Sequence, residues 1–170
     1  YPIVDLGALE ARSLDPIEVA RAIVSTRPAC IQLRAKGVGS RRTLELLRAL
    51  RAVATDGGVR LFANDRPDLA ILAGCDGVHL GQDDVPPGLA KDLAERTGHA
   101  LLVGRSTHDE EQLLAALDEP VDYVAIGPVL ATSSKIALST PYGFSPGPDP
   151  VLGTDRARAL ARVAKSRRPE

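Results

Sequence analysis

Polar and charged side chains recur just after short apolar segments of this chain. The first set is Gln32, Arg34 and Lys36, at the end of the apolar segment 29–33. Alternation along an extended strand places Gln32 and Arg34 on one side, with Lys36 two residues further along. The two cations at this spacing attract a polyanion, and the glutamine amide can hydrogen-bond to a planar heterocycle. The alternative is a solvated loop with ordinary surface charges, and the segment alone does not decide between them.

Two acidic stretches follow later apolar segments: Asn64 with Asp65, and Asp83 with Asp84. Carboxylates at neighbouring strand ends can share a hard cation such as Mg²⁺, which keeps part of its water shell and accepts phosphate oxygens of a substrate. The alternative is that Asp65 and Asp84 only cap the turn and the helix that follow them, although a carboxylate can do both. Spacing alone does not separate Asp83 from Asp84 as a ligand.

Hydroxyl groups and one more cation follow the last two apolar segments. Ser106 lies just beyond the fifth segment, and Thr132, Ser134 and Lys135 lie in a loop beyond the sixth. Hydroxyls, loop amides and a lysine form a phosphate cradle, although serine and threonine are also common in turns for conformational reasons. His79 lies inside an apolar segment, where a hydrogen-bonded structural histidine is at least as good an interpretation as a catalytic one.

The elements that must position these residues are apolar segments that alternate with helical patterns. Continuous apolar stretches are typical of parallel strands covered on both faces, and they predict strands at residues 1–5, 29–33, 60–63, 77–80, 100–104 and 123–127. Capping residues and prolines predict helix starts at Asp15-Pro16, Ser40 (before 41–54), Pro67, Pro86-Pro87, Asp109 and Thr154 (before 155–164). This repeat predicts an α/β protein with a parallel sheet.

A doubly wound open sheet and a (β/α)8 TIM barrel both fit this repeat. No G-x-G-x-x-G fingerprint follows the first predicted strand and no P-loop is present. Polar residues at the carboxyl ends of several strands favour the barrel. We therefore predict one TIM-barrel domain over residues 1–170, incomplete with about six βα units, lacking the seventh and eighth and leaving two strand edges unpaired. The proline- and glycine-rich segment 135–151 predicts a long loop, either a mobile lid or an insertion.

Composition excludes several classes of protein. Of 170 residues, 44% are hydrophobic and 25% are charged, which is ordinary for a packed domain. No apolar run approaches the roughly 18 residues that span a bilayer, so we expect no membrane partner. A net charge of −1 and only 3% aromatic residues argue against nucleic acid. The N-terminal residues lack the pattern of a signal peptide, and two cysteines without metal spacing fit a reducing compartment, so we expect a cytoplasmic protein.

The order of the candidate residues resembles that of the thiamine-phosphate synthase family. The matching pieces are Tyr1-x-Ile3-x-Asp5, Gln32-Leu-Arg-Ala-Lys-Gly, Asn64-Asp65, Gly77-Val-His-Leu-Gly-Gln-Asp-Asp84, Ser106-Thr-His108 and Ile126-Gly-Pro-Val129. They extend over about residues 1–135, and the piece that ends at Asp84 is the most specific. The resemblance implies a (β/α)8 barrel and a Mg²⁺-dependent transferase. Such an enzyme joins hydroxymethylpyrimidine pyrophosphate to a thiazole phosphate and releases pyrophosphate.

The resemblance also implies a role for each candidate residue. The pyrimidine and its pyrophosphate would be bound by Gln32, Arg34, Lys36, Asn64 and Ser106. The leaving group would be held by Thr132, Ser134 and Lys135. The Mg²⁺ ion would be held by Asp65 and Asp84. Arg34, Ser106 and Lys135 would be catalytic. The family usually has threonine where Ser134 stands, a change that keeps the hydroxyl.

Two other functions are open on the sequence. The related thiazole tautomerases commonly have a histidine where this chain has Pro128, and the retained carboxylates and hydroxyl–lysine loop favour pyrophosphate chemistry, so the synthase is the preferred prediction. A non-catalytic, ligand-binding barrel is the alternative from another class, because the last two βα units are missing. The expected partners are small-molecule substrates, and the oligomeric state, including a homo-oligomer, stays open.

Overall fold

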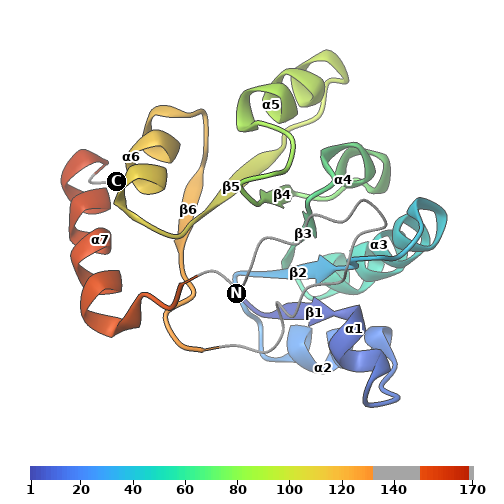
Figure 1. Ribbon diagram of the computed structural model, residues 1–170. Helices are drawn as coiled ribbons and strands as arrows, with labels where there is room; N and C mark the ends of the chain where they lie inside the picture. Colours follow the sequence, from blue (N-terminus) through green and yellow to red (C-terminus); the bar gives the residue numbers. More distant parts are fainter. Residues whose placement is uncertain (132–149, 169–170) are drawn as a thin grey trace.

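The computed structural model describes residues 1–131 and 150–168. These residues form strands and helices that alternate along the chain (Figure 1). The strands are β1 (Ile3–Asp5), β2 (Cys30–Arg34), β3 (Arg60–Asn64), β4 (Gly77–Leu80), β5 (Leu102–Thr107) and β6 (Tyr123–Ile126). The helices are α1 (Leu6–Glu10), α2 (Pro16–Ser25), α3 (Ser40–Asp56), α4 (Pro67–Ala73), α5 (Pro87–Arg96), α6 (Glu110–Asp118) and α7 (Gly153–Arg167).

The strands form one parallel sheet in chain order, from β1 to β6. Figure 1 shows the sheet curving around a centre, with the helices on its outer side. Because each helix returns the chain to the same end of the sheet, the carboxyl ends of all strands meet at one rim. Within the described residues β1 and β6 do not pair, so the sheet is an open arc of a TIM-type barrel. The predicted fold class, with six βα units and two open edges, is confirmed.

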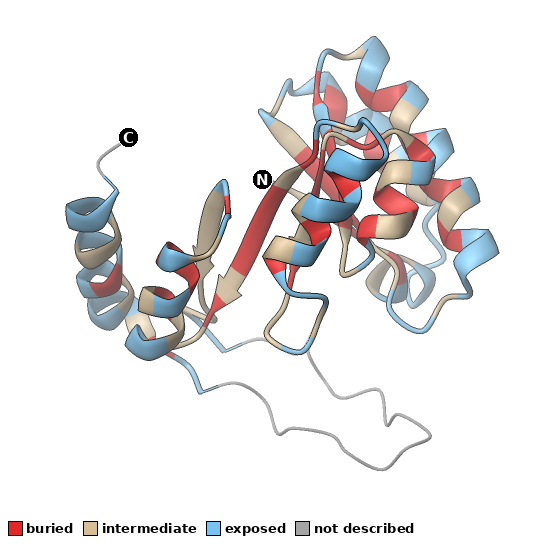
Figure 2. Ribbon diagram, turned by 90° about the horizontal axis from the view of Figure 1, so that it is seen from above, coloured by how far each residue is buried: buried red, intermediate tan, exposed pale blue. Residues whose placement is uncertain are grey.

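The main core lies between the outer side of the arc and the helices. Outward-pointing strand residues are aliphatic and almost wholly buried, namely Ile31, Leu33, Leu61, Val78, Leu80 and Val103. They pack with Leu46, Leu47 and Leu50 of α3, and Figure 2 shows this buried layer in red. Fully burying a side chain of this size is worth about 1.5–3 kcal/mol. Aliphatic burial therefore supplies most of the stability of a chain that is poor in aromatic residues.

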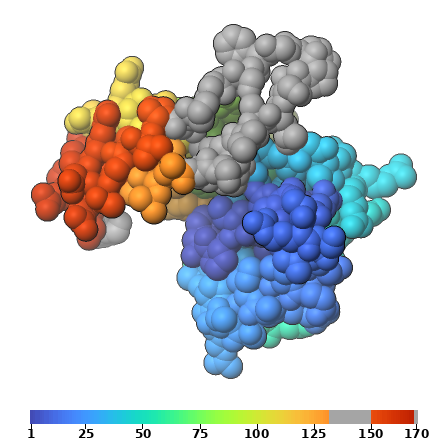
Figure 3. All heavy atoms as spheres, turned by 60° about the horizontal axis from the view of Figure 1, so that its bottom comes forward, coloured from blue at the N-terminus to red at the C-terminus, as the bar shows by residue number. Residues whose placement is uncertain are grey.

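A smaller apolar cluster joins α6 and α7. It consists of Leu113, Leu117, Leu152 and Leu160. Figure 3 shows α7 (red) packed beside β6 (orange), at the opposite end of the arc from α2. No helix in the described ranges is long and apolar enough to cross a membrane.

The inner side of the arc holds aromatic rings. They belong to Tyr1, Phe62, His79 and Tyr123. The ring centroids of Tyr1 and Tyr123 lie 5.8 Å apart, nearly perpendicular, and those of Phe62 and Tyr123 also lie 5.8 Å apart. Gly104 makes room for Tyr123, because a Cβ at this glycine would overlap the tyrosine ring. The aromatic residues in the described part of the chain thus gather inside the arc and not in the main core.

Two aspartates tie strands together at the amino ends of the sheet. Asp76, just before β4, accepts the N–H of Leu61 at 2.8 Å and also binds an arginine of α3. Asp122, just before β6, accepts the N–H of Val103 at 2.6 Å and binds Lys91 of α5 at 2.6 Å. In both places an aspartate side chain therefore accepts a backbone N–H near the start of a strand, in β3 and in β5.

Most helix starts follow the sequence signals, with two exceptions, Thr154 and Ser40. Thr154 does not open the last helix: α7 begins at Gly153 without a side-chain cap, because the N–H groups of Leu152 and Gly153 donate to the carbonyls of Pro128 and Val129. The side chains of Asp15 and Asp109 accept N–H groups in the first turns of α2 and α6, as predicted. Ser40 does not cap a helix: α3 begins at Ser40 itself, after Gly39, without a side-chain cap. The hydroxyl of Ser40 instead accepts a hydrogen bond from Arg66 at 3.1 Å, so this prediction is wrong because a tertiary partner takes the capping oxygen.

Candidate active site

The predicted site residues that the structure describes gather at the carboxyl rim of the arc. Gln32 and Arg34 belong to β2, Asn64 to β3 and Ser106 to β5, while Lys36, Asp65 and Asp84 lie in the loops just beyond the strands. Parallel pairing of neighbouring strands brings these groups to the same end of the sheet. Thr132, Ser134 and Lys135 lie outside the described residues.

Arg34 is held in place by a carboxylate from the neighbouring strand. Its Nη1 donates to Oδ2 of Asp5 at 2.6 Å, and both side chains are about four-fifths buried, with 21% and 18% exposed. The other carboxylate oxygen of Asp5 accepts the N–H of Ala8 and caps α1. A guanidinium has five N–H donors, and the carboxylate oxygen of Asp5 accepts from Nη1 only. Arg34 is thus oriented at the rim and keeps the capacity to bind an anion.

Two carboxylates face each other across the next strand ends. The side chain of Asp84 lies against that of Asp65, and its Oδ2 accepts the N–H of Gly81 at 2.7 Å. Burial, followed by the nearby Asp65, raises the pKa of Asp84 to about 6. Lys36 is the nearest cation, with its Nζ 3.4 Å from Oδ2 of Asp65. A pair of carboxylates that repel each other to this degree is a favourable place for a divalent cation.

The backbone at Asp65 is unusual and helps to set this geometry. Its φ of 64° lies in the left-handed region, which aspartate tolerates better than most residues. The N–H of Asp65 donates to the carbonyl of His79 at 2.8 Å, so pairing with β4 extends one residue past the end of β3. This hydrogen bond holds the residue where its carboxylate meets Asp84.

The capping alternative for the two aspartates is wrong. The residue before α4 is Arg66 and the residue before α5 is Pro86, and neither helix has a side-chain cap. Asp83 is exposed, whereas Asp84 is partly buried and faces Asp65. Geometry therefore separates the two neighbours that sequence spacing left equivalent.

Asp65 and Asp84 could hold a metal ion that takes few of its ligands from the protein. Within the described residues no three His, Cys, Asp or Glu side chains converge on one point. Mg²⁺ is commonly bound by one or two carboxylates, with water and substrate phosphate oxygens completing its octahedron. Asp65 and Asp84 supply that number of carboxylates, and Lys36 and Arg34 lie at the same rim for the phosphates.

Arg105 is a functional candidate that sequence reasoning missed. It lies on β5, points away from the arc interior and is only 8% exposed. Its guanidinium donates to the carbonyl of Gly81 at 2.6 Å and to that of Gln82 at 3.4 Å. Gln82 in turn donates to the carbonyl of Ser106. These bonds fix the loop that carries Asp84, and no local motif in the sequence announces them.

We expect Arg105→Met to weaken Mg²⁺-dependent ligand binding by about tenfold, because it fills the space but leaves the loop carbonyls without a buried donor. Isothermal titration calorimetry with the pyrimidine pyrophosphate measures this, and Arg105→Lys should lie between the variant and the wild type. An affinity unchanged in Arg105→Met would show that the loop holds Asp84 without this side chain.

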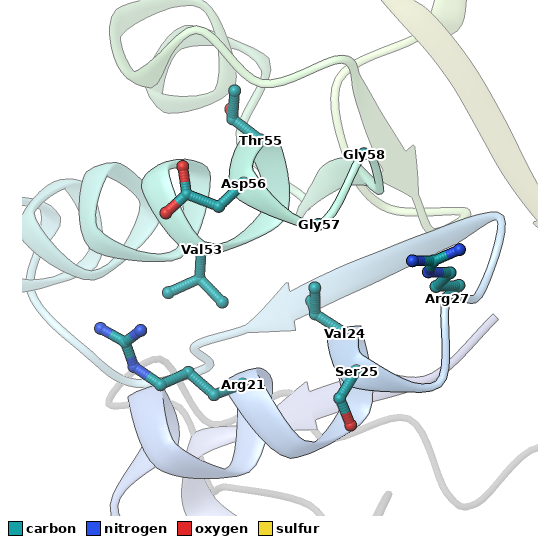
Figure 4. A pocket seen from close by; sticks show the side chains of 9 residues that line it. All are labelled: Arg21, Val24, Ser25, Arg27, Val53, Thr55, Asp56, Gly57 and Gly58. Carbon is teal, nitrogen blue, oxygen red and sulfur yellow. The ribbon is translucent and has the colours of Figure 1, made fainter.

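A surface depression of about 730 Å³ lies elsewhere, between the carboxyl ends of α2 and α3 (Figure 4). Its lining includes Arg21, Arg27, Asp56 and Gly57. These residues precede β2 and β3, so the depression lies at the amino ends of the strands and not at the rim. The candidate site is thus defined by the chemistry of the rim and not by the size of a hollow.

The fold and the rim together place the chain in the parallel βα-barrel class, with cations and carboxylates gathered at the carboxyl ends of the strands. The sequence profile described as thiamine monophosphate synthase matches residues 1–146. The chain belongs to the thiamine monophosphate synthase family. Enzymes of this family are transferases that act on small molecules and use a metal ion.

Individual relatives agree with this assignment. The chain is 38% identical over 163 residues to a thiamine-phosphate synthase of Solidesulfovibrio magneticus, which covers 96% of this chain and 72% of the relative. It is 52% identical over 105 residues to the thiamine-phosphate synthase of Thermus thermophilus, covering 62% and 48% of the two chains. A solved structure of a thiamine phosphate pyrophosphorylase from Pyrococcus furiosus superposes with a TM-score of 0.75 at 25% identity, covering 95% of this chain and 68% of the other. The chain thus spans between half and three-quarters of the length of these relatives.

Proposed function

We propose that this chain carries the pyrimidine-pyrophosphate half of a thiamine-phosphate synthase site. The reaction joins hydroxymethylpyrimidine pyrophosphate to a thiazole phosphate, with Mg²⁺ as the metal and pyrophosphate as the second product. The observation that supports this most directly is the contact between Asp65 and Asp84, beside Lys36, at the rim of the arc.

Each rim residue has a role in this proposal. Asp65 and Asp84 hold Mg²⁺, which would supply charge neutralisation on the pyrophosphate. Arg34 and Lys36 bind the pyrophosphate oxygens, and Asn64 donates its amide to the same group. Gln32 and Ser106 lie deeper on the inner side and bind the pyrimidine. The resemblance adds Thr132, Ser134 and Lys135 around the leaving group.

No nucleophilic side chain is required for this chemistry. The exocyclic amine of the pyrimidine releases electrons into the ring, the bond to pyrophosphate breaks, and the thiazole nitrogen attacks the cation-like methylene carbon. The cations at the rim then stabilise the charge that develops on the leaving group, and the site holds the two rings in line. This matches a rim that offers cations, carboxylates and amides. Chemistry of this kind on small phosphorylated molecules is also consistent with the cytoplasm.

The experiment is a calorimetric titration of the chain with the pyrimidine pyrophosphate, with and without Mg²⁺. We expect binding that depends on Mg²⁺. In Asp65→Asn the affinity for the pyrimidine pyrophosphate should fall by about 100-fold, because one of the two carboxylate ligands is removed. Asp83→Asn is the matched control: this exposed aspartate adjoins Asp84, and its variant should bind within about twofold of the wild type.

A chain that folds by circular dichroism but binds the pyrimidine pyrophosphate neither with nor without Mg²⁺ would overturn the proposal. Equal losses in Asp65→Asn and Asp83→Asn would instead assign the effect to general charge at the rim. The tautomerase alternative predicts binding of thiazole ligands only, and the same titration with a thiazole phosphate separates it.

A further inference from the structure

A chain of hydrogen bonds crosses the inner side of the arc and joins the two residues proposed to bind the pyrimidine. Gln32 Nε2 donates to Tyr1 Oη at 3.0 Å, and Tyr1 Oη lies 2.7 Å from Tyr123 Oη. Tyr123 Oη lies 2.9 Å from Nδ1 of His79, and Nε2 of His79 lies 2.8 Å from Oγ of Ser106. The chain therefore runs from β2 through the N-terminal segment, β6 and β4 to β5.

The distances permit a proton assignment that uses every link of this chain in one direction. The amide nitrogen of Gln32 can only donate, so the hydroxyl of Tyr1 accepts there, and we assign Tyr1 as the donor to Tyr123. In this assignment Tyr123 donates to Nδ1 of His79, and His79, as a neutral imidazole, carries its proton on Nε2. That proton points at the oxygen of Ser106, and the hydroxyl proton of Ser106 is directed to another acceptor.

Packing and burial keep the middle of the chain in this state. The rings of His79 and Tyr123 stack with 28° between their planes. The Tyr123 ring occupies the space that a side chain at position 104 would fill, which Gly104 leaves open. Burial raises the pKa of Tyr123 and of Tyr1, so both phenols keep the protons that the chain needs. The two phenols therefore serve as fixed donors and not as anions.

We propose that Tyr1, Tyr123 and His79 are positioning residues that set which hydrogen-bonding groups the site presents to the pyrimidine. Gln32 is held with its amide nitrogen engaged, so the group that it presents to the pyrimidine is its carbonyl oxygen, an acceptor. Ser106 is held as a donor. An aminopyrimidine has the complementary pattern, an amine that donates next to a ring nitrogen that accepts. This specificity role rests on the proposed function, whereas the direction of the chain does not.

The direction is tested by nuclear magnetic resonance of the imidazole nitrogens in the protein without ligand or metal. We expect the neutral His79 ring to carry its proton on Nε2 in the wild type. Tyr123→Phe keeps an aromatic ring over Gly104 but removes the hydroxyl that donates to His79. The His79 imidazole should then become a mixture of both tautomers. Phe62→Leu is the matched control, because it alters the same aromatic group without touching a hydrogen bond, and His79 should stay unchanged.

A wild-type His79 protonated on Nδ1 would overturn the direction, and so would a Tyr123→Phe variant with an unaltered tautomer. If Phe62→Leu changed the tautomer as much as Tyr123→Phe, packing and not the hydrogen-bond chain would set the state of the ring. These results are obtained without substrate and do not depend on any activity of the chain.

The specificity role is tested by titrating the pyrimidine pyrophosphate and its analogue without the exocyclic amine, both with Mg²⁺. We expect the wild type to prefer the amine by about 30-fold, as for a buried hydrogen bond to a neutral group, and Tyr123→Phe to reduce the preference to about threefold. Inorganic pyrophosphate should bind equally to both proteins. If both proteins show the same preference, the specificity role fails alone. If the wild type binds neither pyrimidine, the proposed function fails and the specificity role with it.

Discussion

Replacing Asp84 with asparagine is expected to reduce Mg²⁺-dependent binding of the pyrimidine pyrophosphate by about 100-fold or more, because it removes one of the two carboxylates proposed to hold the metal. The same change should stabilise the metal-free protein at neutral pH. Asp84 is partly buried against Asp65, and its negative charge is disfavoured there. Binding by calorimetry and thermal unfolding without metal measure the two effects, which have opposite signs.

The pH dependence of stability follows from the raised pKa of Asp84. Its pKa is about 6 in the folded protein, against 3.8 for an unperturbed aspartate. Between these values the folded chain binds more protons than the unfolded chain, so the free energy of unfolding falls as the pH rises from about 4 to about 6. Above pH 6 the loss is complete, at about 1 kcal/mol after allowance for solvent screening of a part-exposed group.

Asp84→Asn should therefore lack this fall in stability in metal-free buffer, and saturating Mg²⁺ should diminish it in the wild type. A wild-type protein whose stability is flat between pH 4 and pH 6 would contradict the raised pKa. Loss of stability in Asp84→Asn at pH 7 would mean that the contact with Gly81 outweighs repulsion between the carboxylates.

The second large effect is expected at the other end of the sheet. Asp122→Ala should lower the free energy of unfolding by about 2–4 kcal/mol, because it leaves the N–H of Val103 without its acceptor and Lys91 without its carboxylate partner. Val103 is fully buried, so water cannot easily replace the lost carboxylate. Urea unfolding followed by circular dichroism measures the change.

A nearby surface aspartate provides the comparison. Asp92 is exposed on α5, one residue from Lys91, and Asp92→Ala should change stability by less than about 0.5 kcal/mol. The affinity of Asp122→Ala for the pyrimidine pyrophosphate should stay within about twofold of the wild type. A large loss of affinity in this variant would mean that the two ends of the sheet are coupled.

The fold could be predicted from the sequence because its signals are local. Apolar segments of four or five residues between capped or proline-initiated helices predict all of the described strands, and the predicted bounds of Gly77–Leu80 agree with β4 at both ends. The predicted start of β5 at residue 100 was two residues early, because Leu101 and Ala100 are apolar but precede the ladder that begins at Leu102. The short helix α1 was missed because its cap, Asp5, reads as the end of a strand.

The site could be predicted only in part. Residue types at strand ends indicated Arg34, Asp65 and Asp84, since chemistry and position coincide there. The contacts that orient them join residues distant in sequence, such as Asp5 with Arg34 and Arg105 with Gly81, and no spacing rule reveals such pairs. The distinction between Asp83, which is exposed, and Asp84, which faces Asp65, likewise depends on the path of the loop after β4.

The aspartates at the amino ends of the strands have a consequence for how this chain can change. Asp76 and Asp122 bind backbone N–H groups and helix cations far along the strands from the rim, and among the described residues they share no partner with Asp65 or Asp84. Effects of substitutions at separated sites without shared partners add. Mutations that alter ligand preference at the rim can therefore be offset by independent stabilising mutations at the opposite end. Evolution or protein design can therefore vary ligand preference and folding stability through separate sets of residues.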